Sequence, residues 1–309
     1  SVANTNDAPV VASAISEQSA IEDTVFSFTL PGDTFADVDA GDALAYTATL
    51  SSGAALPAWL SFDAATRTFS GTPSNPDVGT LSVRVTATDG GLLGASADFE
   101  LSVANTNDAP LANSDSLTLA QGDTSANLAS ALLANDTDVD AGDTRRITAV
   151  DSAGTLGTLV FDAPTQSLIY RADAAGFAAL GAGASTTDGF TYTIEDAAGT
   201  TSSASVTVQV SGVNDAPVLA SAISEQSAIE DTAFSFTLPD TTFADVDAGD
   251  TLAYTATLSS GAALPAWLSF DAATRTFSGT PSNPDVGTLS VRVTATDGGL
   301  LGASADFDL

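Results

Sequence analysis

Three short acidic loops carry the side chains that are most able to do chemistry. FADVDAGD occupies residues 35–42 and recurs at 243–250, and the related NDTDVDAGD occupies 135–143. Each loop gathers several carboxylates within a few residues. Ca²⁺ accepts roughly six to eight oxygens from carboxylate, amide and backbone groups in flexible geometry, whereas Mg²⁺ takes fewer protein ligands and keeps its waters. The loops are therefore candidates for calcium binding.

The amino-acid composition excludes most of the common catalytic mechanisms. All seven positively charged residues are Arg, and the chain has no Lys, His or Cys. Ser-His-Asp and Cys-His groups, Ser-Lys pairs, Schiff bases and thiolate zinc sites are therefore excluded, as are disulfides and Lys-Asn isopeptide crosslinks. The formal charge of -32 excludes nucleic acid as a natural partner, because polyanions repel carboxylates, and it favours cations.

Three other interpretations of these residues are weaker. An EF-hand loop needs Gly at its sixth position and Glu at its twelfth, but counting from Asp37 those positions hold Asp42 and Ala48. Asp37 and Asp42 could be the acid and base of a glycosidase, but no recognisable substrate cleft accompanies them, so we expect no enzyme. Trp59 and Trp267 could stack on sugars, although the apolar residues around each predict a core anchor.

The chain is built from repeats. Residues 6–101 match residues 214–309 at 90 of 96 positions, while residues 107–213 share little with them beyond the NDAP opening and the DxDxGD loop. A length of 309 residues also predicts two or three domains. The predicted domains are residues 1–104, 105–211 and 212–309.

The sequence carries no visible targeting signal. SVANTNDAP stands at residues 1–9 and again at 102–110, and no stretch is apolar for long enough to span a bilayer. We therefore expect a piece of a longer repeat array, whose targeting signals lie outside these residues.

The hydrophobic period within the first module is two. LSVRVTAT at 81–88 and ASADFELSV at 95–103 alternate apolar with polar residues, and Gly, Pro, Asn and Asp clusters separate such runs. No segment has the period of a long amphipathic helix. The sequence therefore predicts an all-β protein of antiparallel sandwiches, one for each module of roughly 100 residues.

Strand direction sorts the acidic loops into two sets. Because successive antiparallel strands run in opposite directions, alternate loops lie at the same end of a sandwich. The N-terminal pole of the first module is expected to hold Asn6, Asp7, Asp37, Asp39 and Asp89. The C-terminal pole is expected to hold Glu22, Asp23 and Asp77.

Modules stacked end to end would bring these two sets together. At the first junction the second set would meet Asn105, Asn107, Asp108, Asp138, Asp140 and Asp196. At the second junction the corresponding partners are Asn214, Asp215, Asp245, Asp247 and Asp297. Carboxylates about 4 Å apart repel by roughly 4 kcal/mol per pair at an effective dielectric near 20. Bound Ca²⁺ would remove this repulsion, so we predict calcium at both junctions.

Longer motifs resemble a known family. LPAWLSFDAATRTFSGTP, at 56–73 and 264–281, is similar to dystroglycan-type cadherin-like domains. In the middle module NDAP, LLANDTDVDAGD, DGFTYTIEDAAG and SVTVQVSGVNDAP resemble the tandem cadherin-like repeats of large bacterial proteins such as RTX-type surface adhesins. The resemblance covers essentially the whole chain. It implies three Ig-like or cadherin-like Greek-key β-sandwiches in linear tandem, with calcium at their junctions.

Carried over by position, the resemblance implies particular calcium ligands. They are Glu22, Asp77, Asn107, Asp108, Asp138, Asp140 and Asp196, with Asp188 as the expected counterpart of Asp77 in the middle module. The second junction departs from the pattern, because Gln121 or Asp123 stands where Glu22 would be. Gly212 also replaces Asn105 there. We therefore expect the second junction to bind fewer ions, or to bind them more weakly.

Together these features predict a structural protein. We expect an extender segment of a large bacterial cell-surface adhesin or secreted repeat protein, outside the cell, whose junctions calcium makes rigid. The expected partners are neighbouring repeats of the same chain and a surface glycan or protein, with no nucleic acid and no membrane insertion, and the chain is expected to be a monomer. The alternative is a carbohydrate-binding module of an adhesin or of a secreted polysaccharide-degrading enzyme.

Overall fold

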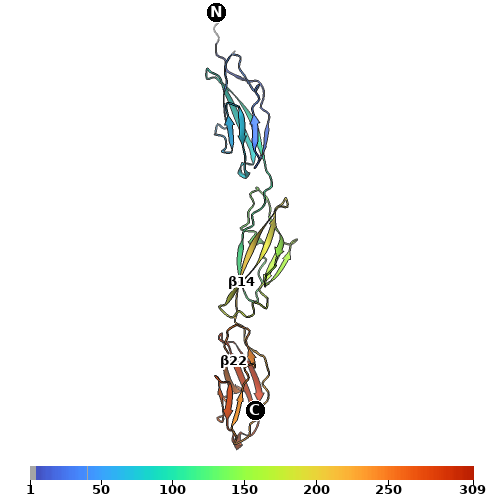
Figure 1. Cartoon of the computed structure of the whole chain (residues 1–309), viewed down its shortest axis with the longest axis vertical. Helices are drawn as coiled ribbons and strands as arrows, with labels where there is room; N and C mark the ends of the chain where they lie inside the picture. Colours follow the sequence, from blue (N-terminus) through green and yellow to red (C-terminus); the bar gives the residue numbers. More distant parts are fainter. Residues whose placement is uncertain (1–4, 40) are drawn as a thin grey trace. The chain divides into compact units, whose positions relative to one another are not determined.

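The computed structural model describes residues 5–39 and 41–309 of the chain (Figure 1). Nearly all of the regular structure in this part is β-strand, as the sequence predicts. Its helical elements are the short α1 (Ala129–Leu132) and the 3-10 turns η1 (Asn75–Asp77) and η2 (Asn283–Asp285). None of the described helices is long and apolar enough to cross a membrane. The described strands form a tandem of β-sandwiches.

The chain divides into two compact units. The first contains residues 1–110, 137–144 and 196–200, and the second contains the remainder. The first unit thus holds the first sandwich, the linker after it, and two loops that belong to the middle module in sequence. The domain boundaries after residues 104 and 211 therefore stay a prediction.

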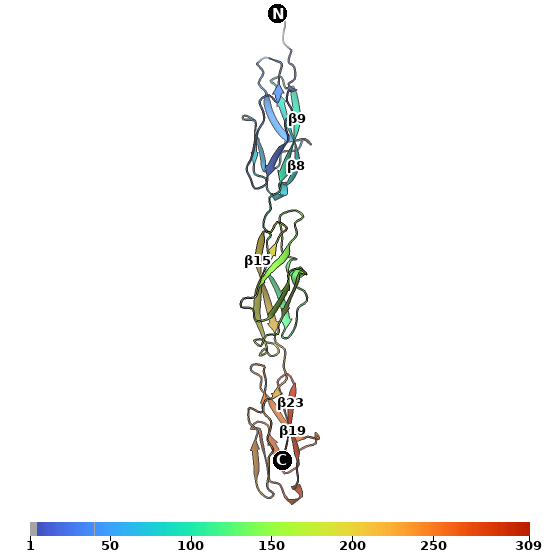
Figure 2. The same ribbon diagram turned by 90° about the vertical axis from the view of Figure 1, so that its right-hand side faces the viewer.

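The first sandwich has two main sheets. The larger has the strand order β2-β9-β8-β5 and the smaller has the order β3-β7-β6, while β1 and β4 form a separate pair. Figure 2 labels β8 and β9 of the larger sheet. All neighbouring strands are antiparallel except β2 and β9, which are parallel. The strands are β1 (Val10–Val11), β2 (Gln18–Ile21), β3 (Phe26–Thr29), β4 (Phe35–Ala36), β5 (Ala45–Leu50), β6 (Leu60–Asp63), β7 (Thr68–Gly71), β8 (Gly79–Thr88) and β9 (Gly94–Ala104).

The alternating sequence of β8 builds the core of this sandwich. Val83, Val85 and Ala87 are fully buried, and the residues between them are more exposed. The Trp59 ring packs against the same core, 6.3 Å from the ring of Phe26. The prediction that Trp59 anchors the core is confirmed.

The middle sandwich has a core of its own, with two buried tyrosines. The Tyr170 hydroxyl donates to Asp188 at 2.5 Å, and the Tyr192 hydroxyl lies 2.9 Å from Asp115 and 3.0 Å from Asp136. Burial, reinforced by these carboxylates, raises the pKa of both tyrosines. Its sheets have the orders β10-β15-β14-β11 and β12-β13. The strands are β10 (Asp115–Ala120), β11 (Arg146–Asp151), β12 (Thr158–Asp162), β13 (Ser167–Arg171), β14 (Ser185–Glu195) and β15 (Thr201–Ser211).

The third sandwich repeats the first, but its described residues form no counterpart of β2, and β22 and β23 are shorter than β8 and β9. Its sheets have the orders β19-β22-β23, β17-β21-β20 and β16-β18. Residues 226–229 form no strand, although the identical residues of the first sandwich form β2. The strands are β16 (Val218–Leu219), β17 (Phe234–Thr237), β18 (Phe243–Ala244), β19 (Ala253–Leu258), β20 (Leu268–Asp271), β21 (Thr276–Gly279), β22 (Ser290–Thr296) and β23 (Gly302–Asp308).

Candidate metal centres

Each acidic loop folds around the first carboxylate of its DxD pair. Asp37 Oδ1 accepts a hydrogen bond from the backbone N–H of Asp39 at 2.9 Å. The pairs Asp138 with Asp140 and Asp245 with Asp247 repeat this contact, both at 3.0 Å. Asp side chains favour such turns, because the carboxylate accepts from the backbone two residues further along. The turn uses one carboxylate oxygen, and the second one is buried without a hydrogen-bond partner in the described structure.

The Asn-Asp pair of each linker binds the same two partners in all three modules. In the first module, Asp7 N–H donates to Asp39 Oδ2 at 2.8 Å, and Asn6 Nδ2 donates to Asp89 Oδ2 at 3.0 Å. The matching contacts are Asp108 to Asp140 at 2.8 Å, Asn107 to Asp196 at 2.8 Å, Asp215 to Asp247 at 2.8 Å and Asn214 to Asp297 at 3.0 Å. We call the linker pair, the DxD loop and the hairpin Asp together a cradle.

A glycine lets the linker Asn approach the hairpin in the outer modules. A Cβ at Gly91 would lie 2.6 Å from Nδ2 of Asn6, and a Cβ at Gly299 would lie 2.4 Å from Oδ1 of Asn214. Both distances are shorter than a non-bonded contact allows. These glycines therefore belong to the cradle, although they carry no ligand atom.

The first unit brings the C-terminal pole of the first sandwich to the cradle at residues 107–108. Glu22, which directly follows β2, is 1% exposed, and its Oε1 accepts a hydrogen bond from Thr106 N–H at 2.6 Å. Single oxygens of Glu22, Asp108 and Asp140 lie within 4.8 Å of one another. Asn105 Nδ2 donates to Asp140 at 2.9 Å. The predicted gathering of these residues at the first junction is therefore present in this unit.

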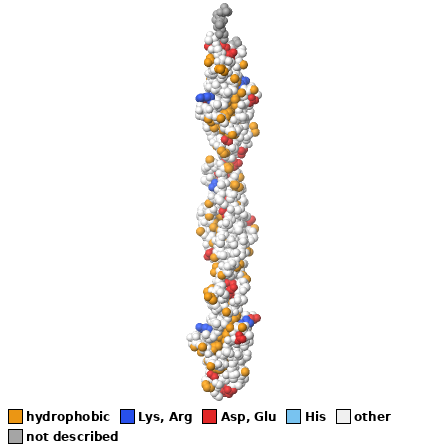
Figure 3. Space-filling view, turned by 90° about the vertical axis from the view of Figure 1, so that its left-hand side faces the viewer, with side chains coloured by type: hydrophobic (Ala, Val, Ile, Leu, Met, Phe, Trp, Pro, Cys, Tyr) orange, Lys and Arg blue, Asp and Glu red, His pale blue; other side chains and the backbone are white. Residues whose placement is uncertain are grey.

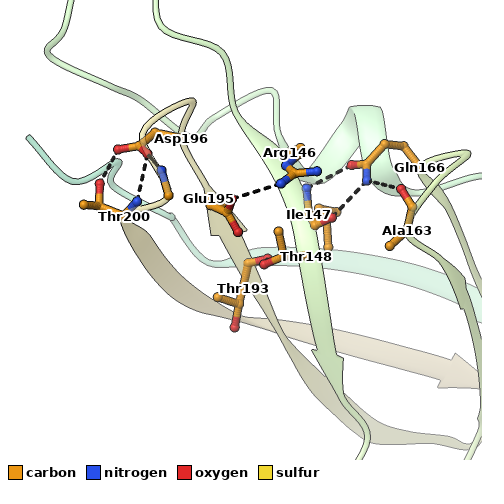
Figure 4. A network of polar contacts seen from close by, with 10 residues as sticks. Arg146, Ile147, Thr148, Ala163, Gln166, Thr193, Glu195, Asp196 and Thr200 are labelled. Carbon is orange, nitrogen blue, oxygen red and sulfur yellow. Dashed lines mark hydrogen bonds and ion pairs between the residues drawn. The ribbon is translucent and has the colours of Figure 1, made fainter. Parts of the chain in front are cut away.

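A second cluster lies in the same unit and consists of Asp138, Asp143 and Asp196. The Thr200 hydroxyl donates to Asp196, and this bond is the largest of several that lower the pKa of Asp196 to about 2 (Figure 4). On the neighbouring strands, Glu195 pairs with Arg146 at 2.9 Å. Hydrogen bonds to both of its oxygens thus favour the ionised form of Asp196.

Two further clusters lie in the outer modules. They are Asp37 with Asp42 and Asp89, and Asp245 with Asp247 and Asp250. Desolvation, followed by repulsion from the neighbouring carboxylates, raises the pKa of Asp42 and of Asp250. Acidic side chains also gather in small groups on the face drawn in Figure 3, where basic ones are few. The direction of the two pKa shifts is the one that desolvation and nearby carboxylates both produce.

The second unit shows whether Gln121 or Asp123 takes the position that Glu22 has in the first unit. Gln121 N–H donates to Ser211 O at 2.8 Å, as Glu22 N–H donates to Ala104 O at 3.1 Å. Gln121 Nε2 then donates to Asp215 at 3.0 Å. Gln121 therefore holds the position of Glu22, and the cradle at this place has one carboxylate fewer.

Backbone fills the position that Asn105 holds in the first unit. A Cβ at Gly212 would lie 2.1 Å from Leu180 O, so a side chain has no room there. The loop that contains Leu180 also contacts the DxD loop, because Ala248 N–H donates to Ala179 O at 3.0 Å.

Three predicted ligands lie apart from the described clusters. Asp188 is 8% exposed inside the middle sandwich, where Tyr170, Leu156 N–H and Gly157 N–H donate to it at 2.5–3.1 Å. Asp77 Oδ2 accepts from both Ser74 N–H and Ser74 Oγ, which caps η1. The exposed Asp23 has a φ of 56° and joins none of these clusters. The assignment of Asp188 as the counterpart of Asp77 is therefore corrected to a structural role in the middle core.

Four cluster residues or neighbours were absent from the predicted set of ligands. They are Asp42, Asp143 and Asp250, which end the DxDxGD motif, together with Asn75. Asn75 Nδ2 donates to Asp108 at 2.7 Å. The three aspartates stand at the same place in every copy of the loop, and that repetition was the available signal. No local signal marks Asn75, because its contact depends on the tertiary fold.

The donor set of the clusters suits a hard cation. Several carboxylate oxygens are buried and have no hydrogen-bond partner in the described structure: Glu22 Oε2, Asp37 Oδ2, Asp138 Oδ2, Asp245 Oδ2 and Asp247 Oδ1. A buried ionised oxygen without a partner is costly, and carboxylates are acceptors only. Oxygen-rich, flexible sites of this kind match the preferences of Ca²⁺.

Two family models match nearly the whole chain. The family described as "Putative Ig domain" matches residues 8–104 and 216–309, and the family described as "Bacterial cadherin-like domain" matches residues 107–212. No curated protein matches the chain.

Solved cadherin ectodomains have a similar fold. Mouse Cadherin-23 EC22-24 is 18% identical, with 98% of each chain covered and a TM-score of 0.54. Human CDH23 EC21-23 is 14% identical over 98% of this chain and 100% of that chain, with a TM-score of 0.59. The Protocadherin GammaB4 extracellular domain is 17% identical over 98% of this chain and 50% of that chain, with a TM-score of 0.55. At these identities the likeness concerns the fold.

Proposed function

Because the chain belongs to the Ig-domain family named above, with a bacterial cadherin-like domain in its middle, we propose that it is a calcium-binding structural segment of an extracellular repeat protein. Tandem repeats of this kind have structural and adhesive roles and are typically not catalytic. More specifically, we propose that the chain is an extender segment of a large bacterial surface adhesin or secreted protein. The assignments to dystroglycan-type domains and to RTX-type adhesins are part of this more specific proposal.

The proposal rests mainly on the buried carboxylate oxygens that have no hydrogen-bond partner in the described structure. Glu22 is the clearest case, since Oε1 accepts a backbone hydrogen bond and the buried Oε2 accepts none. Native proteins rarely leave such a group unsatisfied. A cation beside Glu22, Asp108 and Asp140 would satisfy this oxygen and remove the repulsion among the three carboxylates.

The residues that would hold calcium come from four different segments. In the first unit these are the residue after β2, the linker, the DxD loop and the last hairpin of the middle module. Ions there would be held by Glu22, Asn105, Asn107, Asp108, Asp138, Asp140, Asp143 and Asp196. An ion bound by several segments opposes their separation, so it would stiffen the junction.

The other cradles would take calcium in the same way with fewer ligands. Near the start of the chain the ligands would be Asn6, Asp7, Asp37, Asp39, Asp42 and Asp89. In the second unit they would be Asn214, Asp215, Asp245, Asp247, Asp250 and Asp297, with Gln121 as a neutral contributor.

Calcium titration by calorimetry, with metal analysis after dialysis, tests this proposal. We expect the wild-type chain to bind several calcium ions and Asp140→Asn to weaken the tightest class of sites by at least about tenfold, or about 1.4 kcal/mol. Asp240→Asn is the matched control, because it removes the same charge from an exposed loop outside the cradles. Absence of calcium binding in the wild type, or equal binding by both variants, would refute it.

A further inference from the structure

A loop of the middle sandwich contacts the third sandwich inside the second unit. It comprises residues 172–184 and joins β13 to β14. It is longer than the loop at the same place in the first sandwich, residues 72–78, which joins β7 to β8. Asp173 is the only charged residue of the longer loop. This connection therefore differs from its counterpart in both length and charge.

The loop is anchored in the middle sandwich. Phe177 is fully buried in the core, and Leu180 packs against that core. Leu180 N–H donates to Phe177 O at 2.9 Å. Gly212 N–H, in the linker to the third sandwich, donates to Ala184 O at 2.9 Å. A buried aromatic ring and backbone hydrogen bonds thus fix the loop at both of its ends.

Backbone groups make the contact between this loop and the third sandwich. Ala248 N–H, in the DxD loop of the third module, donates to Ala179 O at 3.0 Å. A Cβ at Gly181 would lie 3.3 Å from Asp247 Cβ, so the two loops pack closely at this point. Neither contact requires an ionised group or a metal ion.

The first unit uses side chains at the corresponding place. From the shorter loop, Asn75 Nδ2 donates to Asp108 at 2.7 Å and lies 3.4 Å from Asp140 Oδ1. In the described part of this unit, no backbone hydrogen bond joins the first sandwich to the DxD loop at residues 137–144. Glu22 brings a third carboxylate to the same place, and the three carboxylates repel one another.

We propose that residues 172–184 act as a strut that holds the middle and third sandwiches together without calcium. Backbone hydrogen bonds and close backbone packing persist when a metal ion is removed, whereas clustered carboxylates then lose their counter-ion. The strut does not depend on the proposed function, but the contrast with the first junction rests on it. Chelation of calcium should loosen the first junction and leave the second one unchanged.

Distances between pairs of spin labels on the whole chain test the inference. The chain has no Cys, so labels attach only to cysteines that are introduced. Ser96, Ser203 and Ser304 are exposed and occupy matching places on the last strand of each sandwich. Labels at the first two report on the first junction, and labels at the last two report on the second. We expect chelator to broaden the distance distribution of the first pair and to leave that of the second pair as narrow as in calcium.

A substitution in the linker should remove the strut. A Cβ at Gly212 would lie 2.1 Å from Leu180 O, so in Gly212→Ala the loop must move away, and the second pair should broaden in chelator. Gly176→Ala is the matched control, because it adds the same methyl group to the same loop, where the nearest atom, Leu156 Cδ1, would lie 3.9 Å away. This control should keep the narrow distribution. Circular dichroism of both variants shows that the sandwiches remain folded.

Either of two results would overturn the inference. One is a wild-type chain whose second pair broadens in chelator as much as its first pair, and the other is a folded Gly212→Ala chain whose second pair stays narrow. Failure of the proposed function gives a different result, because the first pair would then have the same distance distribution with and without calcium.

Discussion

Two kinds of buried carboxylate occur in this chain, and their hydrogen bonds distinguish them. Asp188 accepts from a tyrosine hydroxyl and two backbone N–H groups, so its charge is satisfied by the fold. Asp138 accepts one backbone bond, and its other oxygen is buried without a partner. The first kind stabilises a core, and the second kind suits a metal ion.

The role of Asp188 leads to a prediction about stability. Asp188→Asn should lower the free energy of unfolding of the middle sandwich by about 2–3 kcal/mol, because buried donors lose their charged acceptor. Calcium affinity should not change. Chemical denaturation followed by Tyr fluorescence, with calcium calorimetry on the same variant, measures both. A loss of calcium binding with unchanged stability would reinstate Asp188 as a ligand.

The pH dependence of the same variant gives an independent check. Burial alone would raise the pKa of Asp188, but hydrogen bonds from Gly157, Tyr170 and Leu156 outweigh it and hold the pKa below the ordinary value of 3.8. A depressed pKa contributes stability above that ordinary value, and the contribution is lost as the pH falls through the lower folded pKa. The stability difference between wild type and Asp188→Asn should therefore shrink in this acidic window.

At the scale of elements, the cradle is a repeated unit whose surroundings vary. The linker pair, the DxD loop and the hairpin Asp make the same contacts in all three modules. The residue that faces the cradle from the neighbouring module is Glu22 in the first unit and Gln121 in the second. The two cradles thus differ by one negative charge, in addition to the replacement of Asn105 by Gly212.

This difference predicts unequal calcium affinities. Gln121→Glu should tighten the weaker class of calcium sites by about tenfold, or about 1.4 kcal/mol, because it adds a carboxylate next to Asp215. Gln209→Glu adds the same charge on the exposed face of β15 and should leave the titration unchanged. Calorimetric calcium titrations of the two variants test this prediction. Equal calcium affinities in both variants would contradict the role given to Gln121.

The alternating pattern predicted most strands, because burial on one face follows directly from period two. Strand parity also predicted which loops would gather, since it depends only on counting antiparallel strands. It did not separate Gln121 from Asp123, because they are neighbours in one turn and only the pairing of Gln121 with Ser211 fixes the position. Asp188 was misassigned, although its alternation with the buried Phe190 and Tyr192 on β14 indicated a core-facing side chain.

At the scale of the whole molecule, the formal charge of -32 disfavours the compact state. Seven Arg oppose 39 Asp and Glu, and two of the Arg are in cross-strand pairs with Asp98 and Asp306 at 2.7 Å. Self-repulsion of this size favours expanded states. Cations bound by the folded chain alone would offset it.

Calcium should therefore stabilise the folded chain in proportion to its occupancy. An ion present at roughly 100 times its dissociation constant adds about 2.7 kcal/mol per site. Thermal unfolding in excess calcium should occur at a higher temperature than in excess chelator, and magnesium at equal ionic strength should restore little of the difference. Equal melting temperatures in all three conditions would show that no ion is linked to folding.

Small-angle X-ray scattering of the whole chain, in excess calcium and then in excess chelator at equal ionic strength, most directly tests whether calcium makes the junctions rigid. We predict that chelation shortens the maximum dimension and broadens the distribution of interatomic distances, while the sandwiches keep their circular dichroism. Identical scattering curves with and without calcium, from a chain that metal analysis shows to be loaded and stripped, would contradict it.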